Sequence, residues 1–203
     1  LSKRAQMEMR DAELAPLVNA NTPVETAQQA AFDLSKAIKE VEQQGVLNGP
    51  DRFNAGARKN LEEIHAGLVF NIGQEGVTAY DVFRTVDEAK RRMWDEVIGP
   101  LGSGSGADRL RAKETVDAVR SLWGQARDLT QNTSLWGEAA ARHADMNAKA
   151  HAWMVARDNF LPKVTSQVKG TASEDGLRRG SKQVKEGATK EAESFLSNPA
   201  PED

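Results

Sequence analysis

The chain has 203 residues, no cysteine, and a net charge of −3 that arises from 27 basic and 30 acidic side chains. The absence of cysteine excludes disulfides and thiolate metal sites, and no apolar run approaches the ~18–20 residues that span a bilayer. Leu, Ile, Val and Phe make up roughly a fifth of the residues, close to the level at which a chain struggles to fill a core of its own. Abundant Ala, Glu, Lys, Arg and Gln favour helices, because these side chains lose little rotamer freedom there. We therefore predict an all-α fold, a helical bundle or an extended array of about six helices, with coiled-coil-like packing as one form of it.

A proline at residue 23 separates the first two predicted helices. The first covers residues 1–19, and Pro16 is expected to end or kink it. Thr22-Pro23-Val24-Glu25 then has the pattern of a capping box with proline at the first helical position. Apolar residues recur three and four positions apart in the second helix, as in a coiled-coil or bundle seam, and Gly45 ends it. These residues are Val24, Ala27, Ala31, Leu34, Ile38 and Val41.

Two further helices follow a turn at residues 48–51. The third helix has an apolar stripe and ends near residues 71–73. The fourth begins at Thr78, with Asp81 as its acidic capping partner, and stops at Gly99-Pro100. The two stripes consist of Phe53, Ala57, Leu61, Ile64 and Leu68, and of Val82, Val86, Ala89, Met93 and Val97.

A Gly-Ser run at residues 102–106 predicts a flexible linker between an N-terminal segment of four helices, residues 1–101, and a helical hairpin, residues 107–162. Pro162 ends or kinks the second hairpin helix. Residues 163–203 are expected to form a polar tail, either helical and lying on a partner or partly disordered, because an isolated helix is marginal in water. The hairpin stripes consist of Ala112, Val116, Val119, Trp123 and Ala126, and of Ala139, His143, Met146, Ala150, Trp153 and Phe160.

Nothing in the sequence predicts a catalytic residue, a cofactor or a metal site. His143 and His151 lie eight residues apart, so they do not share a face as an i,i+4 zinc pair does, and with His65 they are expected to be structural. Neighbouring acids such as Glu62-Glu63 point about 100° apart on a helix, which disfavours a glycosidase pair. The Gly-Ser run lacks the preceding strand and the Lys-Ser/Thr ending of a phosphate loop. We therefore expect no small-molecule substrate.

Lys90-Arg91-Arg92 is the strongest basic cluster in the chain. Acidic residues flank it at helical neighbour spacings, so its field is largely neutralised and i,i+4 pairing is the better explanation. Nucleic acid is therefore not an expected partner. The flanking acids are Asp87, Glu88, Asp95 and Glu96.

Two near copies, Ser121-Leu122-Trp123-Gly124-Gln125-Ala126 and Ser134-Leu135-Trp136-Gly137-Glu138-Ala139, begin thirteen residues apart. Thirteen residues turn a continuous helix by about 220°, so both tryptophans face one way only if the helix breaks near residues 131–134. One interpretation makes the tryptophans anchors for a protein partner, since Trp is enriched at binding hot spots. The other places both at helix ends within the local core. The candidate partner contacts are Trp123, Trp136, Trp153 and Phe160.

The segment from Ser134 to Phe160 resembles a helical segment of large structural polypeptides of tailed phages and prophages. The likeness lies in the Leu-Trp-Gly-acid-Ala-Ala opening, the Asn147 that follows about ten residues later, and the closing Phe160. Proteins of that kind are helix-rich internal virion, ejected or tape-measure-like components, sometimes fused to enzymatic modules. The resemblance implies a virion location for the chain and carries no catalytic residue over to it.

Together these patterns predict a non-enzymatic structural or assembly component that packs against other subunits as a homo-oligomer or in a larger assembly. The alternative is a helical regulatory or adaptor domain of a larger polypeptide that contains an enzyme, and a gene with a neighbouring catalytic module would favour it. A lytic enzyme fragment would require cell-wall activity that a single Glu replacement abolishes. The chain begins with Leu1 rather than Met, as a fragment or a processed product would. Outside the virion hypothesis the expected location is cytoplasmic.

Overall fold

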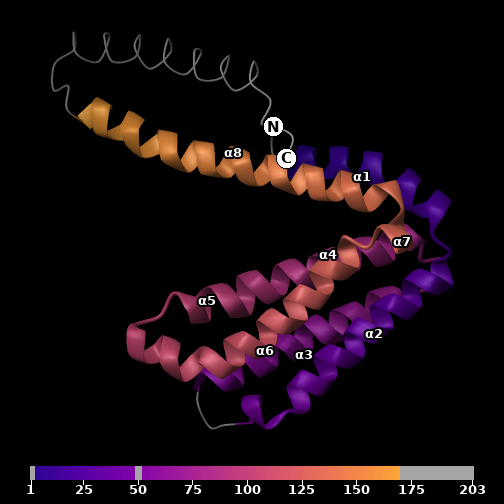
Figure 1. Cartoon of the computed structure of the whole chain (residues 1–203), viewed down its shortest axis with the longest axis horizontal. Helices are drawn as coiled ribbons and strands as arrows, with labels where there is room; N and C mark the ends of the chain where they lie inside the picture. Colours follow the sequence, from indigo (N-terminus) through magenta and orange to yellow (C-terminus); the bar gives the residue numbers. More distant parts are fainter. Residues whose placement is uncertain (1–2, 49–51, 170–203) are drawn as a thin grey trace. The chain divides into compact units, whose positions relative to one another are not determined.

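The computed structural model describes the backbone of residues 3–48 and 52–169, and the side chains of residues 8–48, 52–152 and 155. Every element in this part of the chain is a helix, which confirms the all-α prediction (Figure 1). The chain divides into two compact units, residues 1–146 and residues 147–203. The first unit therefore holds nearly all of the described structure.

Helix α1 (Lys3–Asn21) does not end at Pro16, and helix α2 (Val24–Gln43) begins without the predicted capping box. Pro16 has no amide hydrogen to donate to the carbonyl of Ala12, four residues earlier. Because Pro16 and Ala12 are both exposed, water can solvate that carbonyl, and α1 continues through the proline. The predicted capping box at Thr22 is wrong. The Thr22 hydroxyl instead donates to the backbone carbonyl of Leu135 over 2.5 Å, and Pro23 is the N-cap residue of α2 without a side-chain cap.

The predicted seam of α2 is confirmed. Ala27, Ala31, Leu34 and Ile38 are buried, while Val24 and Val41 are partly buried against the same core. A short 3-10 helix, η1 (Gly45–Leu47), follows and buries Leu47.

Helix α3 (Arg52–Ile72) carries the first predicted stripe, of which only Phe53 is not fully buried. Helix α4 (Ala79–Arg92) buries Val82, Val86 and Ala89 of the second stripe, and Met93 and Val97 are buried in the turn that follows it. The capping box at Thr78 is confirmed: the Thr78 hydroxyl accepts from the Asp81 amide, and the Asp81 carboxylate accepts from the Thr78 amide over 3.0 Å.

The predicted stop at Gly99-Pro100 is wrong, because the backbone continues through a π-helix, η2 (Met93–Ile98), into a short helix, α5 (Gly99–Gly102). Pro100 has no amide hydrogen to give to the carbonyl of Glu96, four residues earlier. The Asn60 side chain donates to that carbonyl instead, over 2.8 Å, while the Gly99 amide bonds the carbonyl of Trp94. The wider π turn thus accommodates the proline without ending the helix.

Three helices follow: α6 (Gly106–Thr130), α7 (Thr133–Trp136) and α8 (Glu138–Lys169). The Gly-Ser run does not divide the chain, because it lies within the first unit, where residues 103–105 form the turn between α5 and α6 and these two helices pack together. Ser105 accepts from the Asp108 amide as the N-cap of α6, so small polar residues serve helix capping here. The boundary between the units lies within α8, after Met146.

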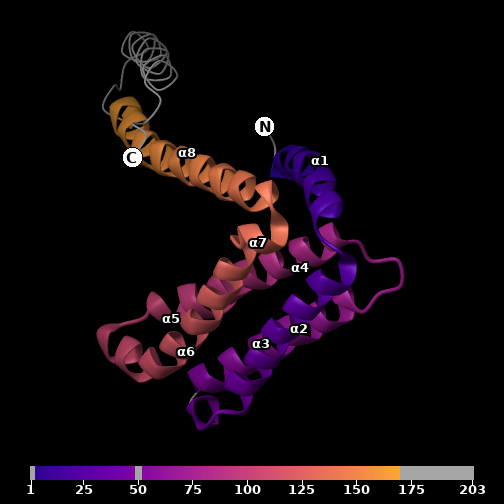
Figure 2. The same cartoon turned by 45° about the vertical axis from the view of Figure 1, so that its right-hand side comes forward.

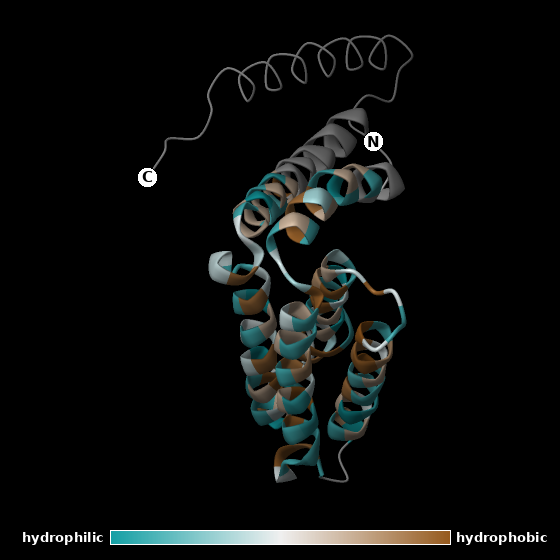
Figure 3. Cartoon of the chain, turned by 90° about the vertical axis from the view of Figure 1, so that its right-hand side faces the viewer, coloured by the Kyte–Doolittle hydropathy of each residue, from teal (hydrophilic) through white to brown (hydrophobic). Residues whose placement is uncertain are grey.

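Helices α2, α3, α4 and α6, with η2, pack together and enclose one contiguous core. Many of its members are alanines, so helices can approach closely where large aliphatic residues are few. Figure 3 shows the hydrophobic residues as stripes along these helices. The largest fully buried side chains include Ile38, Leu61, Ile64, Leu68, Phe83, Met93, Leu122 and Trp136.

The described part of the second unit is the continuation of α8 to Lys169, past Pro162. Residues 147–152 and Val155 are exposed within this unit. Trp153 and Phe160 lie on α8, but their side chains fall outside the described residues. Of the predicted tail, residues 163–169 belong to α8, and residues 170–203 lie outside the described part.

Candidate functional site

Two tryptophans from different helices form an aromatic surface on the first unit. The rings of Trp94, in η2, and Trp123, in α6, lie 5.5 Å apart between centroids at an interplanar angle of 50°. Trp94 is 47% exposed, whereas Trp123 is partly buried against the core. The Arg127 guanidinium lies 5.5 Å from the centroid of the Trp123 ring and also pairs with Asp128. We call Trp94, Trp123 and Arg127 the aromatic patch.

The π turn determines how Trp94 is presented. Met93, Val97 and Ile98 of η2 are buried, and Trp94 lies on the outer side of the same turn. Since a π turn adds a residue to the helical period, it changes which side chains share a face. The helical stripe in the sequence did not predict that Trp94 would be exposed. At the π turn Pro100 has no amide hydrogen to donate, and the Asn60 side chain donates to the Glu96 carbonyl instead.

Of the predicted partner contacts, only Trp123 is a described surface residue. Trp136 is fully buried, its indole nitrogen donates to the carbonyl of Leu129 over 2.6 Å, and its ring meets Phe83 edge-on at 5.1 Å. It is therefore a core residue of the first unit rather than a surface for a partner.

The two similar Ser-Leu-Trp-Gly segments bury different positions in the core. In the first copy Leu122 is buried and Trp123 is partly exposed; in the second Trp136 is buried and Leu135 is only partly buried. The second copy ends its helix at Gly137, whose φ of +59° requires glycine, while Gly124 continues α6. Similar sequences thus adopt different local structures because the helix breaks between them.

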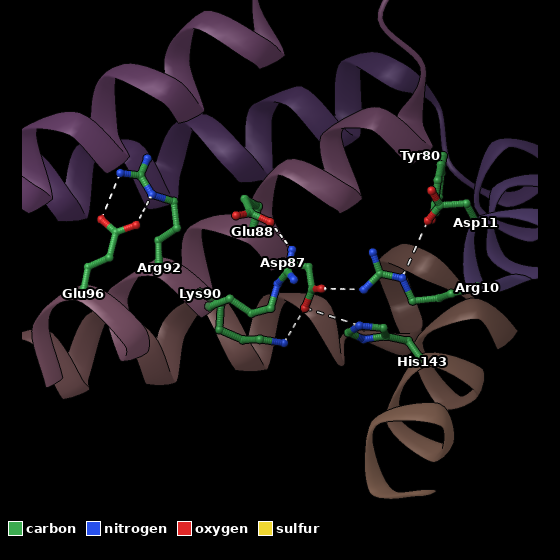
Figure 4. A network of polar contacts seen from close by, with 10 residues as sticks. Arg10, Asp11, Tyr80, Asp87, Glu88, Lys90, Arg92, Glu96 and His143 are labelled. Carbon is green, nitrogen blue, oxygen red and sulfur yellow. Dashed lines mark hydrogen bonds and ion pairs between the residues drawn. The ribbon is translucent and has the colours of Figure 1, made fainter. Parts of the chain in front are cut away.

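A second cluster of interest is a buried polar network around Asp87, which is 3% exposed (Figure 4). Arg10 of α1 donates to Asp87 Oδ2 over 3.1 Å, and Lys90 of α4 donates to Oδ1 over 2.6 Å. His143 Nε2, from α8, lies 3.3 Å from Asp87 Oδ1. One carboxylate therefore connects three helices of the first unit, and the sequence had shown His143 only as one residue of a stripe.

Ionised Asp87 is strongly favoured in this network. Burial acts to raise the pKa of the carboxyl group, but the hydrogen bond from His143 and the charge of Lys90 outweigh it and hold the pKa well below its ordinary value. Nearby, burial raises the pKa of the Tyr80 hydroxyl, which also donates to Asp11 Oδ1 over 2.6 Å. Asp87 is therefore ionised and the Tyr80 hydroxyl is neutral at pH 7, and neither group changes its protonation state near that pH.

The basic cluster is paired much as its flanking acids predict. Arg91 pairs with Glu88, and Arg92 donates to Glu96 over 2.7 Å and lies 3.7 Å from Glu63. With Lys90 held by Asp87, each cation of the run has an acidic neighbour.

An open hollow at the α3–α4 connection is lined by residues that include Asn71, Gly76, Arg84 and Glu88. Neither Asp87 nor His143 lines it. Within the described residues, no group of three or more His, Cys, Asp or Glu side chains is placed to hold a metal ion. In the same part of the chain, none of the helices combines the length and the apolar character needed to cross a membrane.

Neither a protein-family model, nor a curated protein, nor a solved structure matches this chain. The structure itself offers two candidate functional sites, the network around Asp87 and the aromatic patch. The network is buried and connects helices, whereas the aromatic patch is open to a binding partner.

Proposed function

We propose that this chain is a non-enzymatic structural or assembly component that packs against other protein subunits through the aromatic patch. The observation that carries the proposal is the half-exposed ring of Trp94, held against Trp123 on a π turn. Trp and Arg are the residue types most enriched at energetic hot spots of protein interfaces. A large aromatic side chain that is already fixed in place loses little conformational entropy when a partner covers it.

The patch favours an apolar protein surface over a strongly charged partner. Arg127 is paired with Asp128 over 2.9 Å, and Arg120 lies 3.9 Å from Asp117 on the same helix. These neighbouring charges largely cancel, so the tryptophan rings supply the main gain on binding.

A phage-like virion is the proposed setting. Its support is the resemblance of residues 134–160 to structural polypeptides of tailed phages, together with a helical fold that has many alanines in its core. Assembly as a homo-oligomer or within a larger particle agrees with an exposed aromatic patch on an otherwise well-packed unit.

Sedimentation velocity of the purified chain over a wide concentration range tests this proposal. We expect reversible association, and Trp94→Ala should weaken it by about 30-fold or more, as loss of a hot-spot residue does. Leu110→Ala is the matched control, because Leu110 is an apolar residue of α6 that is 75% exposed and outside the patch. A compact monomer at every concentration, or equal association of the Trp94→Ala chain, would contradict the proposal.

A further inference from the structure

The first helix packs against elements that are distant from it in sequence. α1 lies mainly on α4 and α7, whereas α2, which follows it directly, packs on α3, α4 and α6. Figure 2 shows α1 and α2 meeting at a bend. The two helices share α4 as a neighbour, but α7 contacts α1 while α3 and α6 contact α2.

The docking site recognises α1 through both apolar and polar groups. Leu14 and Val18 are fully buried in it, and Arg10 pairs with Asp87 over 3.1 Å. Two further bonds fix the register of the helix: Tyr80 donates its hydroxyl to Asp11 over 2.6 Å, and its amide donates to Asn19 Oδ1 over 2.9 Å. A helix with this spacing of groups fits the site regardless of which copy of the chain supplies it.

Only two residues join α1 to α2. The last helical bond of α1 runs from the Thr22 amide to the carbonyl of Val18, and Pro23 has an extended backbone with φ −61° and ψ 140°. Proline disfavours helical geometry at the residue before it, so Thr22-Pro23 breaks what would otherwise be one long helix. The direction of α1 relative to α2 therefore depends on this hinge.

We infer that the α1-docking site can accept α1 from a second copy of the chain, so that two copies exchange their first helices about the Thr22-Pro23 hinge. Reciprocal exchange preserves the contacts between α1 and its site. Its free-energy cost is mainly the translational and rotational entropy that two copies lose when they associate. The exchange uses α1, α4 and α7 and not the aromatic patch, so it does not rest on the proposed function.

The decisive variant replaces both hinge residues, Thr22→Ala with Pro23→Ala, in the full-length chain that also carries Trp94→Ala. The Trp94 change removes the patch, so any remaining association has another origin. Alanine at both positions favours a continuous helix through α1 and α2, which carries α1 away from its own docking site. We expect a species of twice the monomer mass, with α1 amides protected from hydrogen exchange. In the same Trp94→Ala chain, Thr22→Ala without the Pro23 change keeps the proline and should give far less of this dimer.

A further change, Leu14→Asp, separates helix exchange from unrelated association. Leu14 is fully buried in the docking site, so a charge there blocks docking in either copy. Added to the hinge variant, it should abolish the dimer. A dimer that persists, or a hinge variant that is monomeric with unprotected α1 amides, would overturn the inference.

A measurement on the native hinge guards against failure of the hinge variant to fold. The Trp94→Ala chain is refolded from denaturant at low and at high protein concentration, because exchange competes with folding back only when copies meet. We expect a dimer fraction at high concentration that falls several-fold when a flexible Gly-Ser insertion follows Asn21. The absence of dimers at high concentration, or an equal fraction with the insertion, would also overturn the inference.

Discussion

Asp87 shows how a single residue can hold several helices together. It is buried with two cationic side chains and His143, which come from α1, α4 and α8. Removing its charge leaves Arg10 and Lys90 largely buried without their shared partner, which costs far more than loss of a surface ion pair. The network thus specifies where the first helix and the start of the last helix dock.

We expect Asp87→Asn to lower the free energy of unfolding at pH 7 by about 3–5 kcal/mol, because it breaks a buried ion-pair network. Urea denaturation followed by circular dichroism measures this. Asp33→Asn is the control, since Asp33 forms an exposed pair with Lys36 that is worth about 1 kcal/mol or less. Equal effects of the two substitutions would show that the network contributes little.

The same residue predicts how stability depends on pH. Because its pKa in the folded chain lies below the ordinary value of 3.8, ionised Asp87 contributes its full stability above that value and loses it as the pH falls through the folded-state pKa. The stability difference between the wild-type chain and Asp87→Asn should therefore narrow as the pH falls below about 4. Urea titrations at a series of acidic pH values test this, and a constant difference would contradict it.

At the scale of single elements, the two tryptophan copies provide a matched pair of glycines. Gly137 has a φ of +59°, which a residue with a side chain rarely adopts. Gly124 is helical, and a Cβ atom added there would meet no neighbouring atom within 4 Å. Alanine is therefore strained at the first position and free to fit at the second.

We expect Gly137→Ala to destabilise the chain by about 1–3 kcal/mol, through backbone strain. Gly124→Ala should stabilise it by about 0.5–1 kcal/mol, because alanine favours the helix. Thermal unfolding measures both effects: the melting temperature should fall for Gly137→Ala and rise for Gly124→Ala, relative to the wild-type chain. A stabilising Gly137→Ala would mean that the helix does not break there.

The π turn of η2 depends on a tertiary hydrogen bond. Asn60→Ala removes the donor to the partly buried Glu96 carbonyl and should lower the free energy of unfolding by about 1 kcal/mol, because the acceptor loses its partner. With Pro100→Ala the backbone regains an amide that can reach this carbonyl, so Asn60→Ala should then cost less. A double-mutant cycle in urea measures this coupling, and strict additivity would argue against the explanation of the π turn.

At the scale of the whole molecule, the sequence predicted helices well and tertiary detail poorly. Spacings of three and four identified the buried faces of α2, α3, α4 and α6, because helical periodicity alone determines which residues share a face. The sequence did not identify Trp94 as exposed, and it identified Asp87 only as a neighbour of the basic cluster, since a π turn and a network between three helices depend on residues far apart in the chain. The Gly-Ser run predicted a domain boundary but serves as a turn, because composition does not show what packs on either side.

Contact between this folded unit and a partner through Trp94 is tested most directly by ¹⁹F NMR of the chain labelled with fluorotryptophan. The chain has four tryptophans, so each resonance can be assigned by replacing one residue at a time. The difference in ¹⁹F chemical shift between water and deuterated water reports how exposed each ring is to solvent. As the protein concentration rises, this difference should shrink for Trp94 and stay constant for the buried Trp136. If oligomers form while Trp94 remains as exposed as in the dilute chain, the proposed interface is wrong.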